Sequence, residues 1–159
     1  MPSRGKTIAR RMPAGVMAAV LIILAIVLYA AGGAGAQRIV APDTALTMAR
    51  EGQVMIIDIR RPDEWRETGI PDGAERATVR PSRGANSFLR RIAQLTNGDK
   101  NMPIALICAV GVRSKHASRL LRSRGYSGVL DISEGMLGNG NGAGWLRRNL
   151  PVSSCKNCK

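Results

Sequence analysis

Aromatic residues are scarce in this chain of 159 residues and make up only 3% of it. The complete set is Phe88, Trp65, Trp145, Tyr126 and Tyr29. Proteins that bind single-stranded nucleic acids stack bases on aromatic side chains. We therefore expect no nucleic acid partner, although the formal net charge is +13. Such a charge favours an anionic substrate or an anionic membrane surface, or it belongs to a solvated basic face. Trp65 and Trp145 are expected in the core or in a lid.

Charged residues are absent from positions 12–37, and acidic residues are absent from the basic segment 1–11 before them. Small residues, Gly33 to Ala36, close the apolar run. A basic segment, an apolar segment and a small-x-small site are the three parts of a secretory signal peptide. Residues 1–36 are therefore predicted to be a signal peptide cleaved after Ala36.

An uncleaved membrane anchor is the alternative interpretation of this leader. Residues 12–36 are long enough to cross the hydrocarbon core of a bilayer, which is about 30 Å thick. The basic flank stays in the cytoplasm in either case. The rest of the chain is thus expected in the periplasm or another extracytoplasmic compartment, either soluble or held at the membrane through residues 12–36.

Strand and helix patterns alternate through the remainder. Nearly continuous apolar runs with many β-branched residues predict buried strands, and amphipathic segments predict helices between them. The expected strands are 54–59, 103–108 and 128–132, and the expected helices are 44–50, 88–95 and 114–124. This order predicts an α/β domain over 43–152 with a mainly parallel sheet flanked by helices. A linker, 37–42, precedes it; the glycine-rich segment 138–144 is expected to be a flexible loop, and 153–159 a flexible tail.

Cysteine is also rare, with Cys108 standing alone and Cys155 and Cys158 close together near the carboxyl terminus. The odd number leaves one thiol over if the other two pair. A catalytic Cys-x-x-Cys usually opens a helix after a strand, whereas this one follows Pro151 on the expected tail. In an oxidising compartment a local disulfide is the simplest interpretation. A metal site would lack two ligands, and neither a metal nor another cofactor is expected.

The surroundings of Cys108 predict a reactive thiol. It ends an apolar strand, and Ser114 is expected to cap the next helix six residues later. A helix N-terminus offers free N–H groups and positive partial charge, which favour a thiolate. Gly111 can adopt a positive φ that turns several amides toward one point, and Arg113 has a planar donor fork suited to an oxyanion. The alternative is a buried structural cysteine.

This segment resembles the active-site loop of the rhodanese family, in which a Cys is followed by two variable residues, Gly, one variable residue, Arg, and Ser or Thr. The matching residues are Cys108, Ala109, Val110, Gly111, Val112, Arg113 and Ser114. Further landmarks occur in the family's order: Asp58 and Arg60 with Pro62, Glu64 and Trp65; the turn 69–74; the helix 120–126; and the segments 134–136, 144–146 and 150–152. The His that is usual in the turn 69–74 is absent. The resemblance covers residues 41–152.

The resemblance implies a sulfurtransferase in which the thiolate of Cys108 takes sulfane sulfur from thiosulfate or a similar anionic donor. The persulfide then passes the sulfur to cyanide or a thiol. Arg113 would orient the anion and close the loop, and Ser114 would donate a hydrogen bond toward the sulfur. Asp58 and Arg60 would brace neighbouring loops. Phosphatases of this fold carry the Arg one residue later, so the spacing here favours sulfur transfer.

Three alternatives stay open within this resemblance. The domain could be a non-enzymatic persulfide carrier or a thiol-redox partner module that uses Cys108 and the tail cysteines. Cys155 and Cys158 could act as a relay that takes sulfur from Cys108. His116, the single histidine, could assist Cys108 as a base, although a lone helical histidine is more often simply exposed.

Overall fold

The computed structural model describes residues 38–79 and 85–158. The predicted signal peptide or anchor, 1–36, lies outside the described residues. Within the described ranges no helix is both long and apolar enough to cross a membrane.

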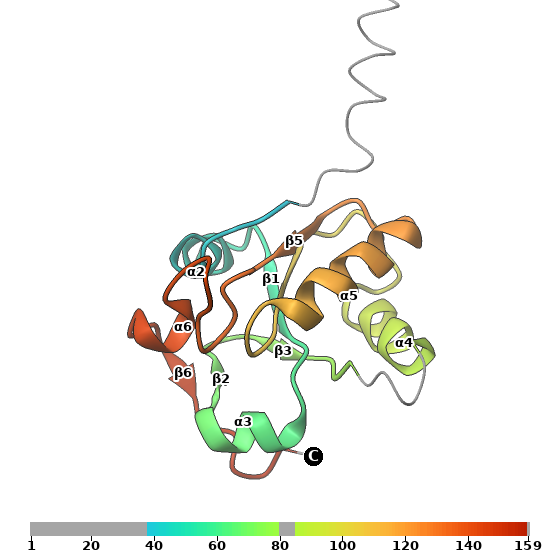
Figure 1. The fold of residues 1–159 in the computed structure, drawn as a ribbon. Helices are drawn as coiled ribbons and strands as arrows, with labels where there is room; N and C mark the ends of the chain where they lie inside the picture. The colour runs from blue at the N-terminus through green and yellow to red at the C-terminus, as the bar shows by residue number, and fades with distance from the viewer. Residues whose placement is uncertain (1–37, 80–84, 159) are drawn as a thin grey trace, which may run out of the picture. The chain divides into compact units, whose positions relative to one another are not determined.

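The centre of the domain is a parallel sheet of four strands in the order β3-β1-β4-β5 (Figure 1). The strands are β1 (Met55–Asp58), β3 (Glu75–Arg76), β4 (Ile104–Ile107) and β5 (Val129–Asp131). Asp58 is paired with Arg76 on one side and Ile107 on the other. All four strands therefore end at one edge, here called the carboxyl edge, where open parallel sheets bind their ligands.

Helices cover both faces of this sheet (Figure 1). The helices on one face are α2 (Pro42–Arg50) and α6 (Gly144–Arg147), and those on the other are α4 (Asn86–Leu95) and α5 (Val112–Ser123). Successive side chains of a strand point to opposite faces. Ile104 and Leu106 of β4 thus join the core under α4 and α5, and Ala105 and Ile107 join the core under α2 and α6. The predicted α/β fold with a mainly parallel sheet is confirmed.

A small antiparallel sheet lies beside the helix α3 (Pro62–Thr68). It consists of β2 (Ile70–Pro71) and β6 (Val152–Ser153). The sequence predicts a free tail over 153–159, but Ser153 pairs with β2, and Arg66 and Arg76 bind Cys158, so the described part of this segment, up to Cys158, packs on the domain. The edge of β2 supplies the backbone partners that the tail composition does not reveal.

The predicted linker 37–42 also packs on the domain where the structure describes it. Ile39 forms a parallel bridge with Asp131, and the N–H of Val40 donates to the Asp131 carbonyl at 3.0 Å. An edge strand such as β5 presents unpaired backbone groups that recruit a passing segment. Helix α2 then begins at Pro42, one residue before the expected start of the domain.

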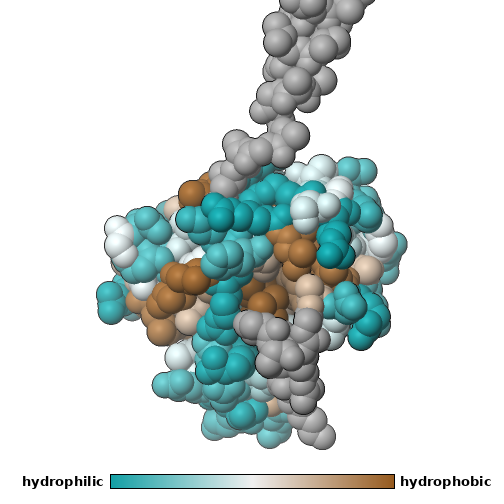
Figure 2. Space-filling model, turned by 45° about the vertical axis from the view of Figure 1, so that its right-hand side comes forward, coloured by the Kyte–Doolittle hydropathy of each residue, from teal (hydrophilic) through white to brown (hydrophobic). Residues whose placement is uncertain are grey.

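The surface seen in Figure 2 is mostly hydrophilic, with apolar side chains gathered in patches between the polar areas. The exposed large apolar residues of the described chain are Ile39, Val110, Val112, Leu137 and Val152. Two of them, Val110 and Val112, belong to the segment between Cys108 and α5.

Candidate active site

Cys108 follows directly after β4 at the carboxyl edge of the sheet. Its side chain is only 1% exposed and belongs to the core under α4 and α5. The segment Cys108–Ser114, here called the cysteine loop, turns from the strand end into α5. The geometry thus places the thiol between a strand end and a helix N-terminus, as the spacing predicts.

The first turn of α5 is aimed at the sulfur. The backbone N–H of Ser114 donates to Cys108 Sγ at 3.4 Å. The Cys108 thiol donates to Ser114 Oγ at 3.7 Å. Ser114 Oγ in turn donates to the Gly111 carbonyl at 3.1 Å. Because the first N–H groups of a helix have no partner within the helix, this amide is free for the sulfur.

The helix begins earlier than the sequence predicts. Gly111 is the N-cap of α5 and Ser114 is its third residue, so Ser114 does not cap the helix. The positive φ of Gly111, 82°, lets the helix begin at Val112. The Ser114 amide therefore lies in the first turn, within hydrogen-bond distance of the sulfur. A Cβ at position 111 would overlap the backbone carbonyl of Ser133, so both the φ and the packing require glycine here.

Two backbone carbonyls of the cysteine loop are bound by the segment that follows β5. The N–H groups of Met136 and Leu137 donate to the carbonyls of Cys108 and Ala109, both at 2.9 Å. These bonds fix the orientation of the loop peptides. The backbone N–H that reaches the sulfur is that of Ser114.

The glycine-rich segment 138–144 contributes the next contact. Asn139 Nδ2 donates to the carbonyls of Val110 and Ser133, each at 2.8 Å. The segment is closed by hydrogen bonds between Asn139 and Gly142. The sequence predicts only a flexible loop here, but the glycines allow a tight turn that delivers Asn139 to the cysteine loop.

Arg113 reaches across to α3 and pairs with Glu64. Its two terminal nitrogens donate to the two carboxylate oxygens at 2.8 and 2.5 Å. Burial raises the pKa of Glu64, but the hydrogen bond from Arg113 and the backbone N–H of Arg61 outweigh it, so the pKa of Glu64 lies below its ordinary value. The same pair raises the pKa of Arg113. The guanidinium fork is thus occupied by a carboxylate of the chain itself.

A buried ion pair connects the end of β1 to the end of α3. Arg60 Nε donates to both carboxylate oxygens of Asp58, and Arg60 Nη2 donates to one of them at 2.7 Å. The same guanidinium also donates to Gly69 O at 2.6 Å and Thr68 Oγ1 at 2.7 Å. Arg60 and Asp58 are 1% and 0% exposed. They connect the end of β1 to the end of α3, which positions Glu64 opposite the cysteine loop.

The remaining candidate residues lie apart from the thiol. His116 is exposed on α5, and within the described residues no hydrogen bond joins it to Cys108. Trp65 and Trp145 are buried core residues. Cys155 and Cys158 form a disulfide, which leaves Cys108 as the free cysteine.

These observations define a class of protein: an α/β domain in which one free cysteine, at the carboxyl edge of a parallel sheet, receives an amide hydrogen bond from the start of the following helix. Residues 41–138 match the family model described as Rhodanese-like domain. The chain belongs to this family.

Individual relatives agree with this assignment. An uncharacterized protein of Rickettsia prowazekii is 29% identical over 98 residues, which cover 60% of this chain and 80% of the relative. The polysulfide-sulfur transferase homodimer of Wolinella succinogenes has a similar structure, with a TM-score of 0.56, 23% identity, and coverage of 74% of this chain and 78% of that one. The thiosulfate sulfurtransferase of Pseudomonas aeruginosa has a TM-score of 0.58 and 19% identity, and the match covers 74% of this chain and 20% of that one. At these identities the two solved structures show a shared fold.

Sequence reasoning assigned no role to two side chains of the site, Glu64 and Asn139. Glu64 stood among the landmark residues of the segment after β1, but nothing in a one-dimensional pattern pairs it with Arg113, which is 49 residues away. Asn139 lies in a glycine-rich run whose composition indicates a loop and conceals its single anchoring side chain.

Proposed function

We propose that this chain is a sulfurtransferase that carries sulfane sulfur as a persulfide on Cys108. The observation that supports this most directly is the hydrogen bond from the Ser114 amide to Cys108 Sγ, made by the first turn of α5. Helix N-termini and convergent amides favour a negative sulfur. The names of the two similar solved proteins, a polysulfide-sulfur transferase and a thiosulfate sulfurtransferase, agree with sulfur chemistry.

The proposed reaction has two covalent steps. In the first, the Cys108 thiolate attacks the outer sulfur of thiosulfate, the S–S bond of thiosulfate breaks, and sulfite leaves with the electron pair. In the second, cyanide or a thiolate attacks the outer sulfur of the persulfide, and Cys108 leaves as the thiolate again. The amide of Ser114 and the dipole of α5 stabilise the anionic sulfur in both states. No cofactor takes part.

Arg113 is proposed both to orient the donor and to close the cysteine loop, and these two tasks compete for one guanidinium. Its guanidinium would orient an anionic donor, yet its fork is bound by Glu64. An anion must therefore share the cation with Glu64 or displace it. This contact favours the alternative in which the chain accepts sulfur from a persulfide on a partner protein and acts as a carrier, because a persulfide carries less negative charge than the thiosulfate dianion and needs less positive charge to bind.

Mass spectrometry after donor treatment tests the assignment. The full chain is incubated with thiosulfate or with an organic persulfide, and one added sulfur is expected on the Cys108 peptide. Cys108→Ser is nearly isosteric, so it should keep the fold, lose the added sulfur and abolish thiocyanate formation from thiosulfate and cyanide. Thiocyanate formed at an unchanged rate by Cys108→Ser would refute the proposed nucleophile. Loading by the organic persulfide but not by thiosulfate would support the carrier.

We further propose an extracytoplasmic location for the domain. The support is the leader pattern of residues 1–36 described above, with cleavage near Ala36 or anchoring through 12–36.

A further inference from the structure

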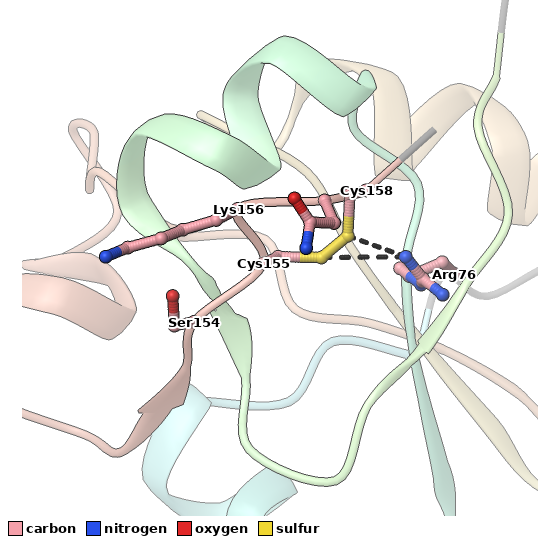
Figure 3. A pocket seen from close by; sticks show the side chains of 6 residues that line it. Arg76, Ser154, Cys155, Lys156 and Cys158 are labelled. Atoms are coloured by element: carbon pink, nitrogen blue, oxygen red, sulfur yellow. Dashed lines mark hydrogen bonds between the residues drawn. A yellow bond between two sulfur atoms is a disulfide. The ribbon is translucent and has the colours of Figure 1, made fainter.

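The disulfide between Cys155 and Cys158 lies in a defined basic setting beneath α3 (Figure 3). Arg66 of α3 donates to the Cys158 carbonyl at 2.8 Å, which fixes the chain end. A hollow of ≈ 390 Å³ opens around the pair and is lined by the side chains drawn in Figure 3. The disulfide is thus part of a concave site, although the proposed reaction at Cys108 makes no use of it.

One guanidinium contacts both sulfur atoms. Arg76 Nη1 lies 2.6 Å from Cys158 Sγ and 3.5 Å from Cys155 Sγ. The indole of Trp65 packs against this guanidinium, with 5.7 Å between Arg76 Cζ and the ring centroid, and holds it in place. Across residues 38–79 and 85–158 no carboxylate forms an ion pair with Arg76. Its positive charge is therefore directed at the sulfurs.

The two sulfurs differ in exposure and in their distance from this charge. Cys158 is 6% exposed and is the nearer to Arg76, whereas Cys155 is half-buried and farther away. In thiol–disulfide exchange the attacked sulfur must be accessible, and the leaving sulfur departs faster when its thiolate is stabilised. Both conditions assign the same direction: attack on Cys155 and departure of Cys158.

We propose that Cys155 and Cys158 form a redox-active thiol–disulfide exchange site whose reaction partner is a dithiol bearing an anionic group. A thiolate of the dithiol attacks Cys155 Sγ, the Cys155–Cys158 bond breaks, and the electron pair stays on Cys158 as a thiolate beside Arg76. The second thiol of the partner loses its proton and attacks the mixed disulfide, releasing Cys155. The partner is oxidised by two electrons to a disulfide, and the protein disulfide is reduced to two thiols.

Basic side chains around the disulfide favour a partner with an anionic group. Arg76 and Lys156 line the hollow at the disulfide, and Arg76 and Arg91 line a neighbouring one. Glu75 pairs with Arg91 at 3.3 Å and is the carboxylate that reduces this positive charge locally. A carboxylate on the dithiol would be attracted to this surface during encounter.

Redox equilibration of the disulfide tests the role of Arg76. The full chain carrying Cys108→Ser, so that only the pair reacts, is equilibrated with dihydrolipoate and lipoate, and the reduced fraction is measured by thiol alkylation and mass spectrometry. Arg76→Gln should shift the equilibrium toward the disulfide about tenfold, or about 30 mV for this two-electron couple. Arg91→Gln is the control for a neighbouring arginine that does not contact sulfur: Arg91 pairs with Glu75 and donates to the backbone carbonyl of Arg76 at 3.1 Å. It should shift the equilibrium less than twofold. Equal shifts in the two variants, or a disulfide that is reduced only on unfolding, would overturn the proposal.

Two further measurements test direction and partner class. With glutathione, a monothiol, peptide mapping should find the mixed disulfide on Cys155; equal labelling of Cys158 would refute the proposed direction. Dihydrolipoate should reduce the pair severalfold faster than neutral dithiothreitol, and this advantage should fall at high salt and in Lys156→Gln. Equal rates would refute the anionic partner. Because Cys108 is absent from these proteins, failure here leaves sulfur transfer at Cys108 untouched.

Discussion

Arg113 of the cysteine loop and Glu64 of α3 bind each other through two hydrogen bonds of 2.8 and 2.5 Å. The pair joins the loop that holds the thiol to a helix from another part of the chain. It also neutralises the cation that the sequence assigns to an anionic donor. Donor choice and loop closure therefore depend on the same contact.

Removal of the Glu64 charge should favour anionic donors. A charge left unneutralised within ~10 Å of a bound anion is worth on the order of 1 kcal/mol, so Glu64→Gln is expected to raise kcat/KM for thiosulfate roughly three- to tenfold. A neutral organic persulfide should gain little. The matched control is Asp63→Asn, which removes a neighbouring carboxylate that binds Arg61 instead. If both donors respond equally to Glu64→Gln, the pair only holds the loop.

The same pair predicts a pH dependence of stability. The folded-state pKa of Glu64 lies below its ordinary value of 4.5. The unfolded chain therefore binds this proton more readily, and the stabilisation is present above pH 4.5 and is lost as the pH falls through the folded-state pKa. Urea unfolding from neutral pH downward should show a gap between the parent chain and Glu64→Gln that closes below pH 4.5. A gap independent of pH would contradict this assignment.

Glycine at position 111 should be essential to the thiol site. Gly111→Ala forces a side chain into a positive φ, which costs about 1–3 kcal/mol, and its Cβ would overlap the Ser133 carbonyl. We expect lower stability and loss of persulfide formation. Gly140→Ala is the matched control, since its Cβ would meet no atom within 4 Å. Thermal unfolding and sulfur loading measured side by side distinguish the two variants, and an active, stable Gly111→Ala protein would disprove the requirement.

The brace between Arg60 and Asp58 should contribute mainly to folding. Arg60→Met leaves a fully buried carboxylate without its partner, which typically costs about 3–5 kcal/mol. Arg91→Met removes an exposed arginine that pairs with Glu75 and should cost far less. Urea titration of both variants measures the difference. A loss of activity in Arg60→Met without a loss of stability would instead place Arg60 in the chemistry.

Export of the domain can be checked independently. A reporter fused after Lys159 should be active only outside the cytoplasm, and the mature amino terminus should be Gln37. Retention of Met1 on a membrane-bound protein would replace cleavage by anchoring. Reporter activity confined to the cytoplasm would contradict both forms of the proposal.

The sequence by itself determined the local features of this protein. Apolar runs with β-branched residues predicted β1, β4 and β5 because buried parallel strands need apolar side chains on both faces. The spacing from Cys108 to Arg113 predicted a thiol at a strand end, because the apolar run ends at Cys108 and a helix pattern begins a few residues later. The resemblance to the rhodanese family depended on this segment together with further landmarks across residues 41–152, and the family model matches residues 41–138.

Only the tertiary structure decided which distant residues complete the sites. Glu64 and Asn139 bind the cysteine loop, and Arg76 binds the disulfide, through contacts between segments far apart in the chain. A one-dimensional pattern of single side chains does not specify such pairs. The tail was expected to be free because its composition is that of a loop; the unpaired edge of β2 and the guanidinium of Arg76, both elsewhere in the fold, bind it. Local periodicity reports which face of an element is buried, but the partner on that face is chosen by three-dimensional packing.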